Sequence, residues 1–438
     1  MVARGKTSLR GLSEGDRSLE ARFGCQLANP KVAAGAILAG GAAKVVEAAR
    51  GRGRGHVLAI QDTSEINFST TKERRRGLGQ IGKGTGCGVL LHALLTLDAD
   101  SGACLGLLGG EAWTRADGPV AVSHEQRDME ERESMRWLRG AETARGLLPG
   151  AAMVTVVADR ESDIYDEWAL LPGPDFHLLS RAMQDRRLAG GGSLFELAAG
   201  LALADTAELE LRERGPDAPA RRARLELRIG RATIRRPARS PRALPASVEL
   251  TLVEVVEPDP PAGVEPLHWR LLTTHRVETP EQAWRVVGWY KARWAIEQFF
   301  RTLKLQGLRI EDSQLRDAPS LVNHVAVAAR AAVLVMQLVH SRQGHGGEVA
   351  GSVFEDHQIR ALDRRYAARS KTLPNPYPRL SLAWAAWIVA RLGGWSGYRS
   401  SRPPGPVTFF NGLRYFNAFA DGFDEKGRHG DQKDVWIP

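Results

Sequence analysis

Residues 279–307 constrain the fold of this chain most, because they read as one long helix with two unlike faces. Thr279 and Pro280 are typical of an N-cap followed by proline at the first helical position, and Gln282 completes a capping box. Gly307 stands where a glycine commonly ends a helix. We therefore expect one continuous helix whose apolar side faces the core.

Four polar residues fall on one side of this helix. At about 100° per residue, the spacings of 3, 7 and 14 group four side chains within an arc of roughly 60°: Tyr290, Arg293, Glu297 and Lys304. The neighbouring arc is apolar and would face the core: Trp289, Ile296, Phe299, Phe300 and Leu303. A carboxylate flanked by phosphate-seeking groups suits a metal-dependent enzyme acting on a DNA backbone. The alternative is a solvated helix face with pairs three and four residues apart.

Two aspartates follow apolar, strand-like runs. HVLAIQD, residues 56–62, ends in Asp62, and MVTVVAD, residues 153–159, ends in Asp159 before a helical pattern. Carboxylates at the carboxyl ends of strands lie where α/β folds place their sites. The alternatives are a turn aspartate for Asp62 and a helix cap for Asp159.

The rest of the chain suggests more strands and helices around these segments. We expect strands over 88–98, 103–115, 177–181 and 268–274, a helix over 128–147, and an apolar core helix over 320–340. Residues 185–262 alternate like short strands and hold eleven arginines between Arg212 and Arg242, which is typical of a DNA contact face or simply of an exposed sheet. Residues 341–380 look rich in loops, and a small helical unit follows.

Composition narrows the partner and the compartment. The net charge of +9 and a pI near 9.7 favour a polyanion, and nucleic acid is the natural one. The three cysteines have no CxxC spacing, which indicates neither a disulfide framework nor a zinc cluster. The N-terminus has no apolar signal region and no apolar run is long and uninterrupted, so we expect a cytoplasmic protein without a membrane span.

Taken together, these motifs resemble the DDE transposases of the insertion-sequence-four type. The resemblance rests on Asp62, on the segment VVADRESDIY around Asp159, and on the helical spacing Y-x2-R-x3-E-x6-K, the Tyr-Arg-Glu-Lys signature of that family. Further matches are GLGQIGKGTGCGVLLHALL, GLLGGEAWTR and the ARLGGW, RPPGP and NGL run near the C-terminus. The resemblance covers roughly residues 56 to 423.

The resemblance implies an α/β, RNase H-like (retroviral-integrase-like) catalytic core with an inserted β-rich subdomain. The corresponding divisions are a short helical N-terminal DNA-binding region (1–50), the first part of the core (51–184), the inserted β-subdomain (185–265), the second part of the core (266–340) and a helical, dimerising C-terminal domain (341–438). The family usually places a longer helical domain, which recognises the element's ends, before the first aspartate, whereas about 60 residues precede Asp62 here.

The resemblance also implies the site. Asp62, Asp159 and Glu297 would be both the catalytic residues and the ligands of two Mg²⁺ ions, for which Mn²⁺ can substitute. Four residues match DNA-phosphate contacts of the family: Tyr290, Arg293, Lys304 and Arg181. Trp269 matches the tryptophan that stacks on a base flipped out during hairpin formation.

The function implied is that of a bacterial, nucleoid-associated cut-and-paste transposase, a polynucleotidyl transferase and endonuclease. It would nick double-stranded DNA at transposon ends, form and resolve a hairpin, and transfer strands into target DNA as a homodimer. The alternatives are a catalytically idle DNA-binding inhibitor of transposition and a structure-selective nuclease on the same fold.

Overall fold

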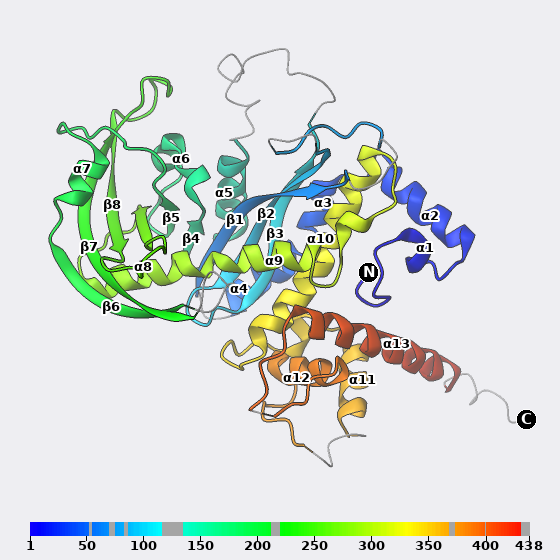
Figure 1. The fold of residues 1–438 in the computed structure, drawn as a ribbon. Helices are drawn as coiled ribbons and strands as arrows, with labels where there is room; N and C mark the ends of the chain where they lie inside the picture. Colours follow the sequence, from blue (N-terminus) through cyan, green and yellow to red (C-terminus); the bar gives the residue numbers. More distant parts are fainter. Residues whose placement is uncertain are drawn as a thin grey trace, which may run out of the picture. The chain divides into compact units, whose positions relative to one another are not determined.

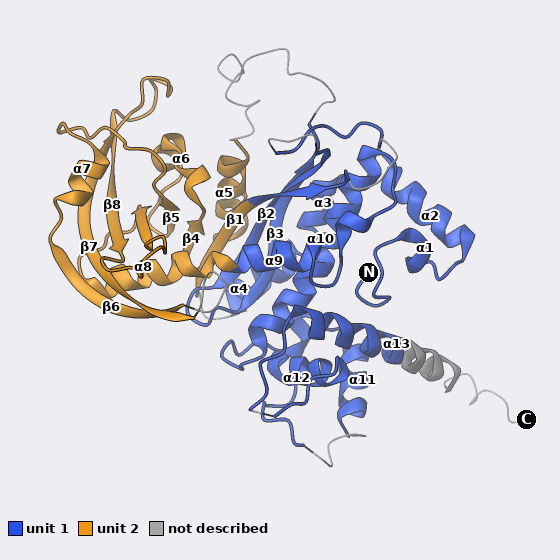
Figure 2. Cartoon of the chain, in the orientation of Figure 1, with its two compact units in different colours: residues 1–55, 63–132, 295–438 blue, residues 56–62, 133–294 orange. Residues whose placement is uncertain are grey.

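The fold is mixed α/β, built around a nine-stranded sheet with helices (Figure 1). The computed structural model describes residues 1–51, 55–69, 75–82, 86–115, 135–211, 220–367, 373–398 and 400–430, without the side chains of 421–430. The chain divides into two compact units (Figure 2): the first holds residues 1–55, 63–132 and 295–438, and the second holds 56–62 and 133–294.

The strand order is β3-β2-β1-β4-β5-β9-β8-β7-β6. The strands are β1 (His56–Asn67), β2 (Gly88–Asp98), β3 (Cys104–Trp113), β4 (Met153–Val157), β5 (Phe176–Arg181), β6 (Leu203–Leu211), β7 (Arg221–Arg235), β8 (Ser247–Val256) and β9 (His268–Thr273). β4 pairs in parallel with both β1 and β5, whereas the β2–β3 pair and the run from β5 through β9, β8 and β7 to β6 are antiparallel. The parallel strands bring the carboxyl ends of β1 and β4 to one edge.

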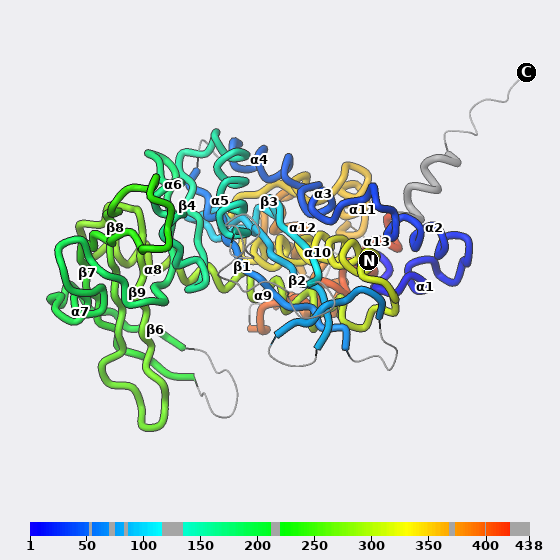
Figure 3. Tube along the Cα trace, turned by 90° about the horizontal axis from the view of Figure 1, so that it is seen from above, coloured from blue at the N-terminus to red at the C-terminus, as the bar shows by residue number. Residues whose placement is uncertain are grey.

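The first unit packs helices against β2 and β3. Its helices are α1 (Leu9–Leu12), α2 (Arg17–Ala28), α3 (Ala34–Ala39), α4 (Ala42–Gly51), most of α9 (Trp294–Lys304), α10 (Ala318–Ser341), α11 (Asp356–Ala367), α12 (Leu382–Leu392) and α13 (Pro406–Gly430). Figures 1 and 3 show α3 and α10 beside β3, with which both are in contact. Every residue of β2 is buried, which explains why its sequence is largely apolar, with His92, Thr96 and Asp98 as its polar residues.

Helix α10 is the central helix of this unit. Among the described residues it is the one helix long and apolar enough to pass for a membrane span, and 72% of the apolar window is buried inside the fold. Its interior positions Val325, Ala329 and Met336 are fully buried, as a core helix requires.

The second unit holds α5 (Met135–Leu147), the short 3₁₀ helix η2 (Arg160–Ser162), α6 (Tyr165–Leu170), α7 (Leu194–Ala199) and α8 (Pro280–Ala292). Thr279 caps α8, and the capping box with Gln282 is present as the sequence predicts. The predicted strand over 88–98 has the expected bounds, and strands β6, β7 and β8 lie in the region of alternating sequence. The first residues of the helix expected over 128–147 lie outside the described part of the chain.

The prediction of one continuous helix over 279–307 is wrong. The helix divides into α8 and α9 at Arg293, whose N–H bonds to the Tyr290 carbonyl at 3.1 Å instead of the carbonyl four residues back. Arg293 also forms an ion pair with Asp62, which lies far away in the sequence. Two smaller expectations fail as well, because β1 continues past Asp62 to Asn67 and the loop-rich region 341–380 contains α11.

Three histidines of the second unit surround Thr155 in the middle of β4. The Thr155 hydroxyl lies 2.8 Å from His56 Nε2 and 2.7 Å from His275 Nε2, and the His177 ring stacks on His275 with centroids 3.9 Å apart. A hydroxyl has one proton, so it donates to one ring nitrogen and accepts from the other. Burial first, and then the nearby His177 and His56, lower the pKa of His275 from 6.5 to about 3. Burial also lowers the pKa of His177, so the stacked rings of His177 and His275 both favour the neutral form.

We expect His275→Gln to flatten the acid side of the stability curve. A base whose pKa falls on folding binds protons only in the unfolded chain between pH 6.5 and about 3, so wild-type stability drops as the pH falls through that window. The loss due to His275 would reach on the order of 4 kcal/mol. Urea unfolding between pH 7 and pH 4 measures it. Parallel wild-type and variant curves would contradict the assignment.

Candidate functional site

Asp62 and Asp159 stand at matching positions on two neighbouring parallel strands. The pairing of β1 with β4 ends at Ile60 and Val157, and each aspartate follows its strand's last paired residue by two positions. Asp62 is only 21% exposed, and its Oδ2 lies 3.3 Å from Nη1 of Arg293, whose side chain is 8% exposed. A buried guanidinium thus neutralises the first carboxylate.

Asp159 leaves β4 and starts η2. Its backbone is extended, and its Oδ1 accepts a hydrogen bond of 2.6 Å from the N–H of Arg160. Asp159 therefore caps a short helix, which was the structural alternative to a catalytic role. Its side chain is half-buried. A carboxylate has two oxygens and the cap uses one of them, so the cap and a functional role are compatible.

Tyr290 joins the remaining predicted residues of the second unit to these carboxylates. It is 3% exposed, and burial first and the charge of Asp159 second raise its pKa, while Arg293 and Arg181 act in the opposite direction. The Arg293 guanidinium lies 5.7 Å from the Tyr290 ring centre. The Trp269 ring meets the Tyr290 ring edge to face at 6.0 Å. The phenol therefore stays protonated at neutral pH and can donate a hydrogen bond.

Six of the eight predicted site residues therefore belong to one neighbourhood of the second unit. Tyr290 is its centre, and the others are Asp62, Asp159, Arg181, Trp269 and Arg293. Trp269 is half-buried. The neighbourhood combines two carboxylates, two guanidinium groups, a phenol and an accessible indole, a set that can attract a phosphate and stack on a base.

Glu297 and Lys304 lie on α9 in the first unit. Glu297 is in the first turn of the helix and is half-buried, between the fully buried Ile296 and Phe299. Burial lowers the pKa of Lys304, while Glu311 and Glu65 raise it. These two glutamates also accept backbone N–H groups, Glu311 from Asn67 and Glu65 from Gly82, each at 2.9 Å. Lys304 therefore has acidic neighbours in its own unit.

The arginines of β7 are largely matched by glutamates. Arg228 pairs with Glu226 at 2.7 Å and Arg231 with Glu249 at 2.7 Å. Arg221 forms a two-pronged pair with the buried Glu257, which raises the pKa of the guanidinium and lowers that of the carboxyl. The basic face expected from composition is therefore partly neutralised, which favours the plainer interpretation of these strands. Arg212 and Arg214 lie outside the described residues.

Two buried acids next to Asp159 were not singled out from the sequence. Asp163 accepts a 2.6 Å bond from Arg186 Nε and two backbone N–H groups, so it anchors the turn after η2. Glu167 is 1% exposed, accepts a 2.7 Å bond from the Ser162 hydroxyl, and has its pKa raised to about 8 by burial. Their only signal was the density of acids in DRESDIYDE, where surface and core acids look alike.

We expect Glu167→Gln to stabilise the protein increasingly as the pH rises. The carboxyl is ordinarily ionised above pH 4.5 in the unfolded chain but keeps its proton in the fold up to about pH 8, so wild-type stability is lost across that window. The gain of the variant at pH 8 would be on the order of 4 kcal/mol. Urea unfolding from pH 4 to pH 9 measures it. The exposed Glu161→Gln serves as the control, and an equal gain there would argue against Glu167.

The donor chemistry of the predicted metal ligands fits a hard cation. Asp62, Asp159 and Glu297 offer only carboxylate oxygens, which suit Mg²⁺ or Mn²⁺. Within the described part of the chain, no three His, Cys, Asp or Glu side chains are grouped so that they could hold a metal ion. The ion pair of Asp62 with Arg293 shows that this carboxylate takes a cationic partner.

Comparison with known proteins adds little. No family model matches the sequence. Among solved structures, the chain is similar to the piggyBac transposase of a cryo-EM synaptic complex with hairpin DNA, at a TM-score of 0.37 and 8% identity. The match covers 85% of this chain and 54% of that one, so this chain spans about half of its length. We draw no inference from a likeness this distant.

Proposed function

We propose that this protein is a transposase that cleaves DNA strands at transposon ends through a hairpin intermediate and transfers them into target DNA. The observation that supports this proposal best is the group of residues around Tyr290. The carboxylates of Asp62 and Asp159 lie there together with Arg181, Arg293 and the half-buried Trp269. Carboxylates alone would repel a DNA backbone, and the guanidinium groups among them offset that repulsion.

We also propose that β1 to β5 form an RNase H-like core. The order β3-β2-β1-β4-β5, with β4 parallel to β1 and β5 and with β2 antiparallel to β3, supports this. In this core Asp62, Asp159 and Glu297 would hold Mg²⁺ or Mn²⁺, which when bound activates the attacking oxygen and stabilises the leaving one. The DNA-bound form would be a homodimer in the cytoplasm.

The chain's own side chains have separate tasks in this proposal. Arg293 and Arg181 would orient phosphates, with planar guanidinium groups suited to two-pronged contacts, and Lys304 would add a point charge. The Tyr290 hydroxyl would donate a hydrogen bond to a phosphate oxygen. Trp269 would hold an unstacked base through its exposed ring, which is worth ~1–3 kcal/mol and offsets part of the unstacking cost.

The test is cleavage of labelled DNA that carries the inverted repeats flanking the gene, with Mg²⁺ or Mn²⁺, for the wild type and Glu297→Gln. Metal-dependent nicks and hairpins at the repeat, absent in the variant, are the expected result. Binding without cleavage by both proteins would instead favour the inhibitor of transposition. Cleavage of branched DNA without regard to the repeats would favour the structure-selective nuclease.

A further inference from the structure

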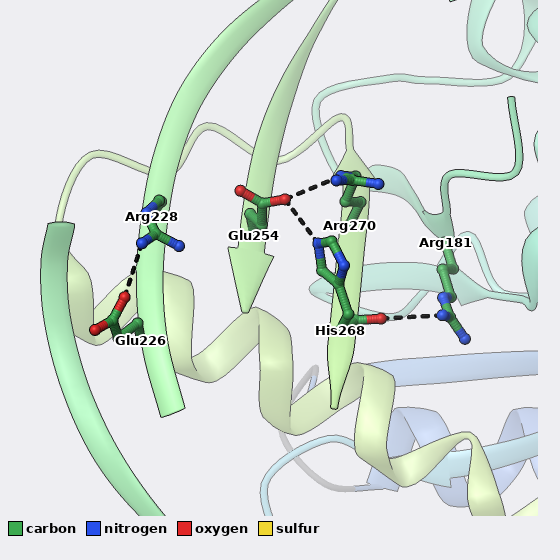
Figure 4. A network of polar contacts seen from close by, with 6 residues as sticks. All are labelled: Arg181, Glu226, Arg228, Glu254, His268 and Arg270. Atoms are coloured by element: carbon green, nitrogen blue, oxygen red, sulfur yellow. Dashed lines mark hydrogen bonds and ion pairs between the residues drawn. The ribbon is translucent and has the colours of Figure 1, made fainter. Parts of the chain in front are cut away.

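A buried carboxylate on β8 holds the two residues that flank Trp269. Figure 4 shows Glu254 of β8 bonded to both His268 and Arg270 of β9, with His268 Nε2 at 2.8 Å and Arg270 Nε at 2.9 Å from the same Oε1 atom. Glu254 is 3% exposed, whereas the side chains of His268 and Arg270 are 36% and 26% exposed, so a buried carboxylate bonds to two partly exposed partners. Arg181 donates from Nη2 to the His268 carbonyl at 3.0 Å, which ties β5 to the same point of β9.

The strand register places Glu254 and its two partners on the opposite face of the sheet from Trp269. Glu254 lies directly opposite Arg270, and Val255 opposite Trp269, in the antiparallel pair of β8 and β9. Successive side chains alternate between the faces of a sheet, so Glu254, His268 and Arg270 share one face and Trp269 points to the other. The aromatic contacts on the two faces support this assignment. Arg270 lies 4.2 Å from the ring centre of Phe195 in α7, whereas Trp269 contacts Tyr290 of α8.

The network fixes β9 near its start. Trp269 is the second residue of the strand, and the chain before it, residues 257–267, is a long connection without regular structure. Glu257 also holds this end, because its N–H donates to the Leu267 carbonyl at 2.8 Å and its Oε2 accepts from the Leu267 N–H at 3.1 Å. Charge-assisted bonds to a buried carboxylate are stronger than neutral ones, and Glu254 makes one on each side of Trp269.

We propose that Glu254 is a positioning residue for Trp269. It acts through His268 and Arg270, on the opposite face of the sheet, to fix the backbone so that the indole stands beside Tyr290 in the orientation that receives an unstacked base. The effect of Glu254 on catalysis rests on the proposed function. Its effect on the position of Trp269 does not, because it needs only the protein. It assigns Glu254 to the hairpin step, the one that uses Trp269, and not to the first nick.

The first arm of the test needs no DNA. The protein is labelled with 5-fluorotryptophan, and the resonance of Trp269 among the 11 tryptophans is assigned by its loss in Trp269→Phe. In Glu254→Gln, which keeps the size of the side chain but removes its charge, this resonance is expected to shift and broaden. Glu226→Gln is the matched control, because Glu226 pairs with Arg228 within β7, which β8 separates from β9. An unmoved resonance in Glu254→Gln would overturn the proposal.

The second arm measures nicking and hairpin formation separately on end DNA. We expect Glu254→Gln to slow the hairpin step about ten- to hundredfold, as small misplacements do, and to leave the nick within about twofold. In a Trp269→Ala background the same substitution should have no further effect, since it acts through the missing ring. Equal slowing of both steps, or additive effects, would indicate a merely structural role. A shifted resonance in a wild type that makes no hairpins would refute the proposed function and leave the positioning intact.

Discussion

Asp62→Asn is expected to cut DNA ends at least about a thousandfold more slowly than the wild type while binding them no less tightly. The carboxylate is the Arg293 partner and a predicted metal ligand, and an amide is a far poorer ligand for a hard cation. Binding should hold or improve, because the substitution removes a negative charge beside the phosphates and releases Arg293 from its ion pair. Single-turnover cleavage and gel-shift titration on one labelled end measure the two effects.

Asp175→Asn is the matched control for this prediction. Asp175 is an exposed aspartate just before β5, so it lies at the opposite edge of the sheet from the carboxyl ends of β1 and β4. It should leave both cleavage and binding unchanged. If Asp62→Asn cuts at the wild-type rate, Asp62 is a structural partner of Arg293 only, and the carboxylate site proposed here is wrong.

Gly412→Ala is expected to destabilise the helical part of the first unit by about 3 kcal/mol. A Cβ at Gly412 would lie 2.0 Å from the Val389 carbonyl oxygen of α12, and one at Gly393 would lie 2.0 Å from the Thr408 carbonyl oxygen of α13. The two helices therefore approach each other through a glycine from each side, with backbone as the obstacle. Backbone cannot rotate away as a side chain can, so the helices must separate and lose buried contacts such as Phe409.

Urea unfolding and amide hydrogen exchange of α12 and α13 measure this effect. Gly405→Ala, seven positions earlier in the chain, is the control, because a Cβ there meets nothing within 4 Å. Its expected change is within about 0.5 kcal/mol. If Gly412→Ala is equally mild, the two helices pack less closely than described.

The regular elements could be predicted from sequence where local pattern and tertiary structure agree. The run Gly88–Asp98 is largely apolar and is a strand buried along its whole length. The break at Arg293 could not be predicted, because Lys291, Ala292 and Trp294 are all acceptable in a helix. Its ion-pair partner Asp62 is 231 positions away in sequence, so the local pattern carries no trace of it.

The candidate site divides in the same way. Asp62 and Asp159 could be found because each follows an apolar run, and the register of β1 and β4 does bring both to one edge. Glu254, in contrast, sits within SVELTLVEVV as one of two similar glutamates. Only the pairing of β8 with β9 shows that this one faces Arg270, while Glu249 faces solvent. The alternation of side chains along a strand predicts which residues share a face of the sheet. Which residue of the next strand lies opposite depends on the register between the two strands.

The buried side chains His275 and Glu167 both belong to the second unit, and folding shifts their pKa values in opposite directions. The pKa of His275 is lowered and that of Glu167 is raised. Near pH 5.5 the folded unit keeps His275 neutral and Glu167 protonated, since their pKa values are about 3 and about 8. Unfolding restores ordinary values of 6.5 and 4.5, so the imidazole gains a proton as the carboxyl releases one. Near pH 5.5 the proton gained by His275 balances the proton released by Glu167, so these two groups together leave the free energy of unfolding nearly independent of pH there.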